Sequence, residues 1–103
     1  MPLRKRLLND YDVMNVAAKI IVSGRVQGVG FRWFVFKEAQ RVKVAGQVCN
    51  LSDGTVEIEL EGDKQAIEQL ISRVQQGPAF SHVTDVQTTW QAYTGSYREF
   101  NIV

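Results

Sequence analysis

A glycine-rich segment at residues 22–32 has the composition of a loop that binds an anion. Its glycines, Gly24, Gly28 and Gly30, come directly before apolar residues at helical spacing. A loop that leads into a helix exposes backbone N–H groups without carbonyl partners, and the helix dipole adds partial positive charge. Phosphate is the natural ligand of such a site. The glycine spacing fits neither the dinucleotide fingerprint nor the nucleotide P-loop, so the loop alone is equally compatible with a structural turn.

Arg32 and Asn50 are the side chains that could give this loop a chemical role. Arg32 falls in the first turn of the expected helix, where a cation opposes the dipole and a bound anion would remove the conflict. Asn50 ends an expected strand, and its amide could hold a water through the oxygen while the nitrogen contacts a phosphoryl oxygen. Taken singly, the simpler interpretations are a solvated arginine and a turn asparagine. The chemistry therefore depends on the two lying together.

The hydrophobic pattern predicts elements that would bring these residues together. Apolar alternation and helical spacing predict strands over 16–23, 44–50, 55–61, 80–90 and 97–103, a helix starting near Val29 and a second helix between Asp63 and Gly77. This order is that of an α+β, two-layer, ferredoxin-like (split βαβ) sandwich, with two helices on one face of a mainly antiparallel sheet. In that topology the first two strands end at the same sheet edge, so the glycine loop should meet Asn50.

The chain resembles the acylphosphatase family in three segments, VSGRVQGVGFR at 22–32, GQVCN at 46–50 and DGTVE at 53–57. The resemblance extends from about the first strand to Val103. It implies that Arg32 and Asn50 are catalytic, with Asn50 orienting the attacking water. It also implies a phosphate site formed by the arginine and the loop amides, at Gln27, Gly28, Val29, Gly30, Phe31 and Arg32.

The resemblance implies hydrolysis of small acyl phosphates to a carboxylate and inorganic phosphate, without metal or cofactor. A carboxylate is a good leaving group, so positioning and charge neutralisation can suffice. The expected partners are a small-molecule acyl phosphate and inorganic phosphate, the latter as product and competitive inhibitor. No nucleic acid or membrane partner is expected, and the chain is expected to be a monomer. The implied contacts bind the phosphoryl group and not the acyl group, so they do not identify the substrate.

The sequence departs from the family pattern at Lys43 and Gln47. Relatives often have glycine at the first position and tryptophan at the second. A lysine after the first helix would strain the backbone if that position needs a positive φ, at a cost of about 1 kcal/mol. Both departures concern structure, and they leave Arg32 and Asn50 in place.

Composition predicts one domain without a strongly charged partner. The chain has 103 residues, 45% of them apolar, and twelve basic against eleven acidic residues for a net charge of +1. We expect a domain over residues 15–103 and a poorly ordered tail over residues 1–14. The single cysteine favours a cytoplasmic location. A soluble chain is expected because no apolar stretch approaches the roughly 20 residues that span a bilayer.

Other reactive residues are better explained by structure. His82 is the only histidine and has no second ligand near it, so we expect a surface residue and no metal site. Cys49 should point away from Asn50 by strand alternation, which suggests packing. Three glutamates, Glu57, Glu59 and Glu61, are expected to face solvent. For the aromatic residues, packing in the core or at an edge is expected over exposed stacking, namely for Trp33, Trp90, Tyr93 and Tyr97.

Two noncatalytic functions remain as alternatives. RNA-binding modules share the topology, but the strand at 55–61 carries acids and no aromatic residue, which is unfavourable for a polyanion. The nearer alternative is an acylphosphatase-like domain that binds phosphate or a carboxylate for regulation or within a larger assembly. The presence of both Arg32 and Asn50, in a chain expected to be free-standing, favours an enzyme.

Overall fold

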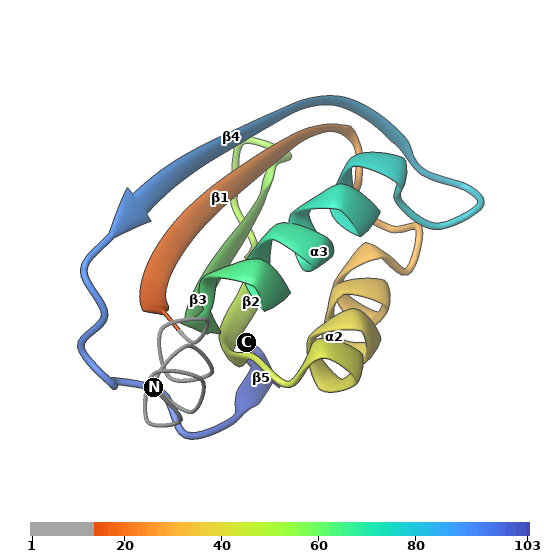
Figure 1. The fold of residues 1–103 in the computed structure, drawn as a ribbon. Coiled ribbons are helices and arrows are strands. Elements are labelled where there is room, and N and C mark those ends of the chain that lie inside the picture. The colour runs from red at the N-terminus through yellow and green to blue at the C-terminus, as the bar shows by residue number, and fades with distance from the viewer. Residues whose placement is uncertain (1–13) are drawn as a thin grey trace, which may run out of the picture.

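The elements of the fold follow the predicted order of five strands and two helices (Figure 1). The structure is a computed structural model that describes residues 14–103. The predicted tail lies outside these residues except for Met14, whose carbonyl accepts a bond of 2.9 Å from the Lys64 N–H. The described elements are β1 (Asn15–Arg25), α2 (Phe31–Val42), β2 (Ala45–Asn50), β3 (Val56–Asp63), α3 (Lys64–Gln76), β4 (His82–Gln91) and β5 (Phe100–Ile102).

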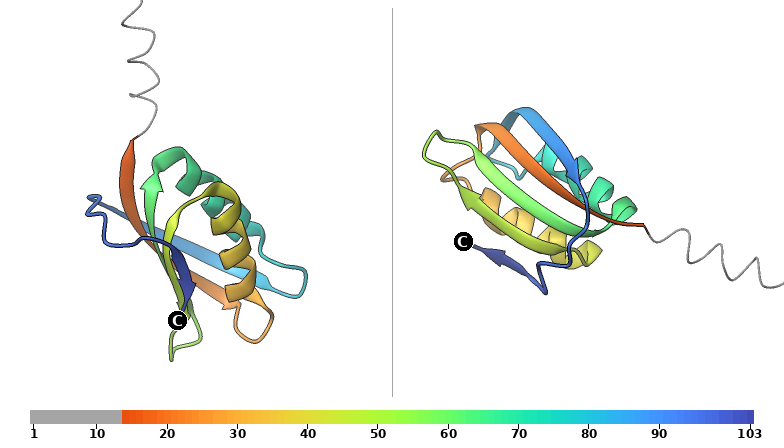
Figure 2. Two further views of the ribbon diagram at one scale, coloured as in Figure 1. Left: turned by 90° about the horizontal axis from the view of Figure 1, so that it is seen from below. Right: turned by 90° about the vertical axis from the view of Figure 1, so that its left-hand side faces the viewer.

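The strands form one sheet with the order β4-β1-β3-β2-β5, and both helices lie on one face of it (Figure 2). All pairings are antiparallel except that of β2 with β5. Since β1 and β2 both run antiparallel to β3, their C-terminal ends lie at the same end of the sheet. Val22 of β1 and Asn50 of β2 both pair with Val56. The α+β ferredoxin-like prediction is therefore confirmed, including the approach of the two strand ends.

Local backbone geometry sets the ends of the helices. The first helix begins at Phe31, two residues after the predicted start, because Gly30 has the left-handed φ of 78° and cannot lie in a right-handed helix. It ends before Lys43, which has φ 62° and is the only non-glycine residue with positive φ in the described part of the chain. In α3 the Asp63 side chain caps the helix by accepting a hydrogen bond of 3.2 Å from the Ala66 N–H.

One apolar core fills the space between the sheet and the helices. Alternate positions of β1 and β3 point into it, as do the apolar stripes of both helices. Its fully buried members, with less than 2% of the side chain exposed, include Ile20, Val22, Phe31, Val35, Val48, Ile58, Leu60, Ile67, Leu70 and Val74. No helix among residues 14–103 is long and apolar enough to cross a membrane.

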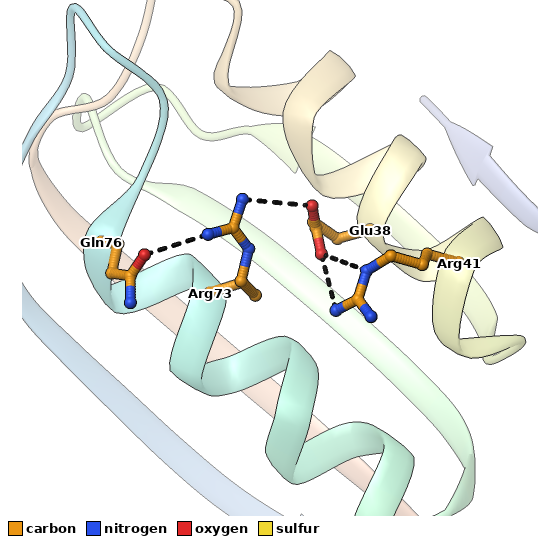
Figure 3. A network of polar contacts seen from close by, with 4 residues as sticks. All are labelled: Glu38, Arg41, Arg73 and Gln76. Carbon is orange, nitrogen blue, oxygen red and sulfur yellow. Dashed lines mark hydrogen bonds and ion pairs between the residues drawn. The ribbon is translucent and has the colours of Figure 1, made fainter.

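A polar network joins the two helices at their outer faces (Figure 3). Glu38 of α2 contacts Arg41 on its own helix at 3.0 Å and Arg73 on α3 at 3.5 Å. Arg73 also donates to Gln76 at 3.0 Å. Burial acts to raise the pKa of Glu38, but the two guanidinium groups outweigh it and lower that pKa. The network therefore joins the second half of α2 to α3.

Glu61 corrects the prediction that the three glutamates of β3 face solvent. Its side chain is buried, with 5% exposed. We define residues 92–99 as the β4–β5 crossover, which passes from one edge of the sheet to the other (Figure 1). Glu61 accepts hydrogen bonds from this crossover, from Thr94 N and Oγ1 and from Ser96 and Tyr97 N. Residues 97–99 therefore belong to the crossover, and β5 is shorter than the predicted strand 97–103.

The aromatic side chains are more exposed than predicted. Trp33 is 55% exposed, Tyr93 46% and Trp90 42%, whereas Tyr97 is half-buried and donates to Glu59 at 3.1 Å. These exposed fractions exclude core packing for the two tryptophans and Tyr93, whereas Trp33 does pack against the Phe36 ring at the surface. Sequence alone gave no means to distinguish these positions from core aromatic residues.

Candidate active site

A cavity of about 180 Å³ lies where the glycine loop, α2 and β2 meet. The loop and the first turn of α2 contribute Val26, Gly28, Gly30, Phe31, Arg32 and Trp33. The neighbouring strands contribute Asn50 from β2 and Ile102 from β5. Arg32 and Asn50, which are separated by a helix and a strand in the sequence, therefore line one cavity.

The backbone of the loop has an alternation of φ angles that favours anion binding. Gly28 has φ 75° and Gly30 has φ 78°, whereas Val29 and Phe31 between and after them do not have positive φ. Alternation of this kind turns successive N–H groups toward one side and forms a concave anion site. A Cβ added at either glycine would meet nothing within 4 Å, so the backbone dihedral angle, and not crowding, requires glycine there.

The start of α2 adds donors to the same site. The first helical hydrogen bond joins the Phe34 N–H to the Gly30 carbonyl at 3.0 Å. The N–H groups of the preceding three residues therefore have no acceptor within the helix, and no side chain caps this end. Arg32 belongs to this turn, and its side chain is exposed. No ion pair among residues 14–103 includes it, so its charge is free to meet an anion.

Asn50 is held by the hairpin that follows β2. The Leu51 N–H donates to the Thr55 carbonyl at 2.9 Å, which closes the turn. Asp53 Oδ1 accepts from Thr55 N at 3.0 Å and from Thr55 Oγ1 at 2.6 Å. These bonds lower the pKa of the Asp53 carboxyl, so the turn is held by a charged acceptor at neutral pH. The exposed Asn50 side chain is thereby presented from a fixed strand end.

The Gln27 side chain joins the glycine loop to this hairpin. Its Nε2 donates to the Leu51 carbonyl at 2.8 Å and to the Thr55 carbonyl at 2.9 Å. Gln27 was predicted to bind phosphate, and with its side chain so engaged the backbone N–H is the group that remains for this role. Its side chain instead holds the loop against the segment that carries Asn50. Sequence reasoning missed this contact.

The predicted phosphate-binding residues divide into those that line the cavity and those that do not. Gly28, Gly30, Phe31 and Arg32 line it, whereas Gln27 and Val29 are not among its lining residues. The Val29 side chain is half-buried and packs against the core. For these two residues the backbone N–H is the only group that could contribute to a phosphate site.

Trp33 and Ile102 line the cavity but were not predicted as site residues. Trp33 follows Arg32 on α2, and this adjacency was a weak signal in the sequence, because consecutive helix residues point in different directions. Ile102 reaches the cavity because β5 pairs in parallel with β2, where Ile102 lies beside Val48. No local pattern in the sequence indicates that pairing.

The other reactive residues do not line the cavity. His82 is exposed at the start of β4. Cys49 is half-buried, and burial together with Glu57 and Glu59 raises the pKa of its thiol, which disfavours the nucleophilic thiolate. Within residues 14–103 there is no group of three or more histidine, cysteine, aspartate or glutamate side chains that could hold a metal ion.

Comparison with known proteins places this chain among acylphosphatases. The acylphosphatase family model matches residues 18–102. The acylphosphatase of Bacillus licheniformis is 48% identical over 84 residues, which are 82% of this chain and 93% of that protein. The crystal structure of acylphosphatase from Bacillus subtilis has a TM-score of 0.83 at 45% identity and covers 85% of this chain and 98% of that one.

The same fold also occurs within a longer chain. The structure of T. kodakarensis HypF has a TM-score of 0.76 at 33% identity, and the match covers 87% of this chain but 12% of HypF. The family model covers residues 18–102 of this chain, and the alignment with the Bacillus licheniformis protein covers 93% of that protein. This chain therefore belongs to the acylphosphatase family.

Proposed function

We propose that this protein hydrolyses the carboxyl–phosphate bond of small acyl phosphates, with Arg32 and Asn50 as its catalytic residues. The observation that carries the proposal is that one cavity is lined by a guanidinium without an ion-pair partner among residues 14–103, by the glycine loop and by an asparagine amide. These are the groups needed to bind a phosphoryl group and to position a water beside it.

The reaction can be written with the groups that line the cavity. The loop amides and the Arg32 guanidinium bind the phosphoryl oxygens and neutralise their charge. The Asn50 Oδ1 accepts a hydrogen bond from water, and its Nδ2 donates to a phosphoryl oxygen. The water oxygen forms a bond to phosphorus as the bond from phosphorus to the acyl oxygen breaks. A carboxylate leaves, and the proton of the water passes to a phosphate oxygen.

This chemistry requires neither an acid on the protein nor a metal. A carboxylate leaves without protonation, and the positive charge that a metal would supply comes from Arg32 and the oriented amides. We further propose that inorganic phosphate competes with substrate, since it carries the same oxygens into the same cavity. We also propose that the protein is a monomer that acts in the cytoplasm; the single cysteine is consistent with that reducing compartment.

The proposal is tested by following the decay of benzoyl phosphate in the presence of a metal chelator. We expect turnover by the unaltered protein and a fall in kcat/KM of about 100- to 1000-fold in Arg32→Ala and in Asn50→Ala. Two variants serve as matched controls. Arg25→Ala removes an exposed arginine from the end of β1, next to the glycine loop, and Asn101→Ala removes an exposed amide from β5; neither residue lines the cavity.

The outcomes separate the possible functions. Equal rates in the four variants and the unaltered protein would reject the assigned catalytic residues. Loss of activity only with the chelator would require a metal mechanism. Binding of phosphate without turnover by the unaltered protein would favour the noncatalytic alternative. Thermal unfolding of each variant distinguishes a lost catalytic group from a lost fold.

A further inference from the structure

The cavity has two chemically different sides. One side carries the polar groups described above. The other side consists of apolar side chains that the proposed phosphoryl chemistry does not use. Val26 and Phe31 are each 1% exposed and belong to the core, whereas Trp33 is 55% exposed and Ile102 is 39% exposed. Two large apolar side chains thus remain open to solvent at the edge of the proposed phosphate site.

Contacts on α2 hold the Trp33 ring in place. It stacks on the Phe36 ring with the centroids 5.2 Å apart and the planes 12° from parallel. The Lys37 ammonium lies 5.9 Å from the centre of the Trp33 ring. The ring is therefore held in one orientation before any ligand binds, which lowers the entropy cost of binding.

The same aromatic contacts connect Trp33 with the strand that carries Ile102. Phe36 packs against Phe100 of β5 with the ring centroids 6.3 Å apart. Phe100 is 2% exposed, so this contact anchors β5 to α2. Ile102 lies two residues further along β5 and borders the cavity. Trp33 and Ile102 therefore come from two elements that a buried contact holds together, and we call this pair the apolar wall.

We propose that the apolar wall binds the acyl group of the substrate and makes the enzyme prefer acyl phosphates with a flat aromatic or a branched apolar acyl group over acetyl phosphate. This inference rests on the proposed function, because it places the phosphoryl group at Arg32. The acyl group extends away from the phosphoryl group, and the exposed apolar surface next to that site is the wall. An apolar acyl group that covers it removes apolar surface of both molecules from water.

The test compares kcat/KM for benzoyl phosphate with that for acetyl phosphate. In the unaltered protein we expect the ratio to favour benzoyl phosphate. Trp33→Ala should lower this ratio by about tenfold, which is within the range that a change of this size in an apolar pocket produces. Ile102→Ala removes less surface and should lower the ratio by about threefold. Trp33→Phe keeps a flat ring and should restore most of the preference.

Trp90→Ala is the matched control. Trp90 is also an exposed tryptophan, at 42%, with a lysine ammonium 5.6 Å from its ring, that of Lys64. It lies on β4, outside the cavity. We expect Trp90→Ala to keep the ratio of the unaltered protein. A ratio that is unchanged in Trp33→Ala, or that falls equally in Trp90→Ala, would overturn the apolar wall.

A binding measurement separates failure of the wall from failure of the proposed function. Benzoylphosphonate and acetylphosphonate resist hydrolysis and serve as probes in calorimetry. Tighter binding of benzoylphosphonate, lost in Trp33→Ala, would support the wall even in a protein without turnover, and the proposed function alone would then fail. Equal affinity for the two phosphonates, with both acyl phosphates hydrolysed, would overturn the wall and leave the proposed function standing.

Discussion

At the scale of single residues, two positions at the ends of α2 are energetically unfavourable by themselves. One is a charge, that of Arg32, and the other is a backbone angle, that of Lys43. Arg32 occupies the positive end of α2, where a cation costs about 0.3 to 1 kcal/mol. A bound phosphate would reverse the sign of this interaction. Lys43 adopts the left-handed region at the other end of the same helix, and no comparable gain explains it.

Lys43→Gly should stabilise the protein. A residue with a Cβ pays for the φ of 62° at this position, and glycine does not, so we expect the free energy of unfolding to rise by about 1 kcal/mol. Urea unfolding measures the change. Lys43→Ala is the control, because alanine keeps the Cβ and should give no such gain. Equal stability of the two variants would show that backbone strain is not the cause.

At the scale of elements, one carboxylate holds the β4–β5 crossover to the sheet. The shortest of its bonds joins Glu61 Oε1 to the Ser96 N–H at 2.6 Å. The crossover leads into β5, which brings Ile102 to the cavity. Burial acts to raise the pKa of Glu61, but the hydrogen bonds from Thr94, Ser96 and Tyr97 outweigh it and lower that pKa below the ordinary value of 4.5.

Glu61→Gln should destabilise the protein by about 2 kcal/mol at pH 7, because the amide loses the charge and places a donor against backbone donors. Since the folded state lowers the pKa of Glu61, its stabilisation is complete above about pH 4.5 and is lost as the pH falls through the folded value. The difference between the variant and the unaltered protein should therefore shrink in acid.

Urea unfolding at pH 7, 5 and 3.5 tests this expectation. Glu68→Gln, on the exposed face of α3, is the matched control and should change stability little. A difference between Glu61→Gln and the unaltered protein that stays constant down to pH 3.5 would contradict a stabilising role for the Glu61 charge.

At the scale of the whole molecule, phosphate binding should be linked to the stability of the fold. The proposed site joins the β1–α2 loop, the start of α2 and the end of β2, and unfolding separates these segments. A ligand that binds only the folded state stabilises it by about 2.7 kcal/mol at 100 times its Kd. Saturating phosphate should therefore raise the Tm of the unaltered protein.

The shift in Tm should be absent in Arg32→Ala and largely retained in Asn50→Ala, because the second variant loses one neutral phosphoryl contact and keeps the loop amides and the Arg32 charge. Thermal scans in phosphate, against sodium chloride of equal ionic strength, measure it. An equal shift in Arg32→Ala would place the phosphate elsewhere on the molecule.

Local sequence patterns were sufficient to predict the elements and their order, whereas the roles of Arg32 and Asn50 were implied by the family resemblance. Alternation in β1 and β3 and the helical stripe of α3 report which face of each element is apolar, and the order of the elements leaves few topologies. That order also brings the loop before Arg32 to the strand end at Asn50. The structure adds that Gly28 and Gly30 have positive φ angles, which other residues rarely adopt.

Only the tertiary structure shows which distant segments of the chain pack against a given strand or loop. Alternation marks Glu61 as facing away from the core, but the crossover that buries it comes more than thirty residues later. Ile102 borders the cavity through a parallel pairing with β2, and the Gln27 side chain bonds to carbonyls 24 and 28 residues away. Sequence periodicity records the orientation of a side chain on its own element. Periodicity does not indicate which distant segments pair, because that pairing depends on the packing of the whole chain.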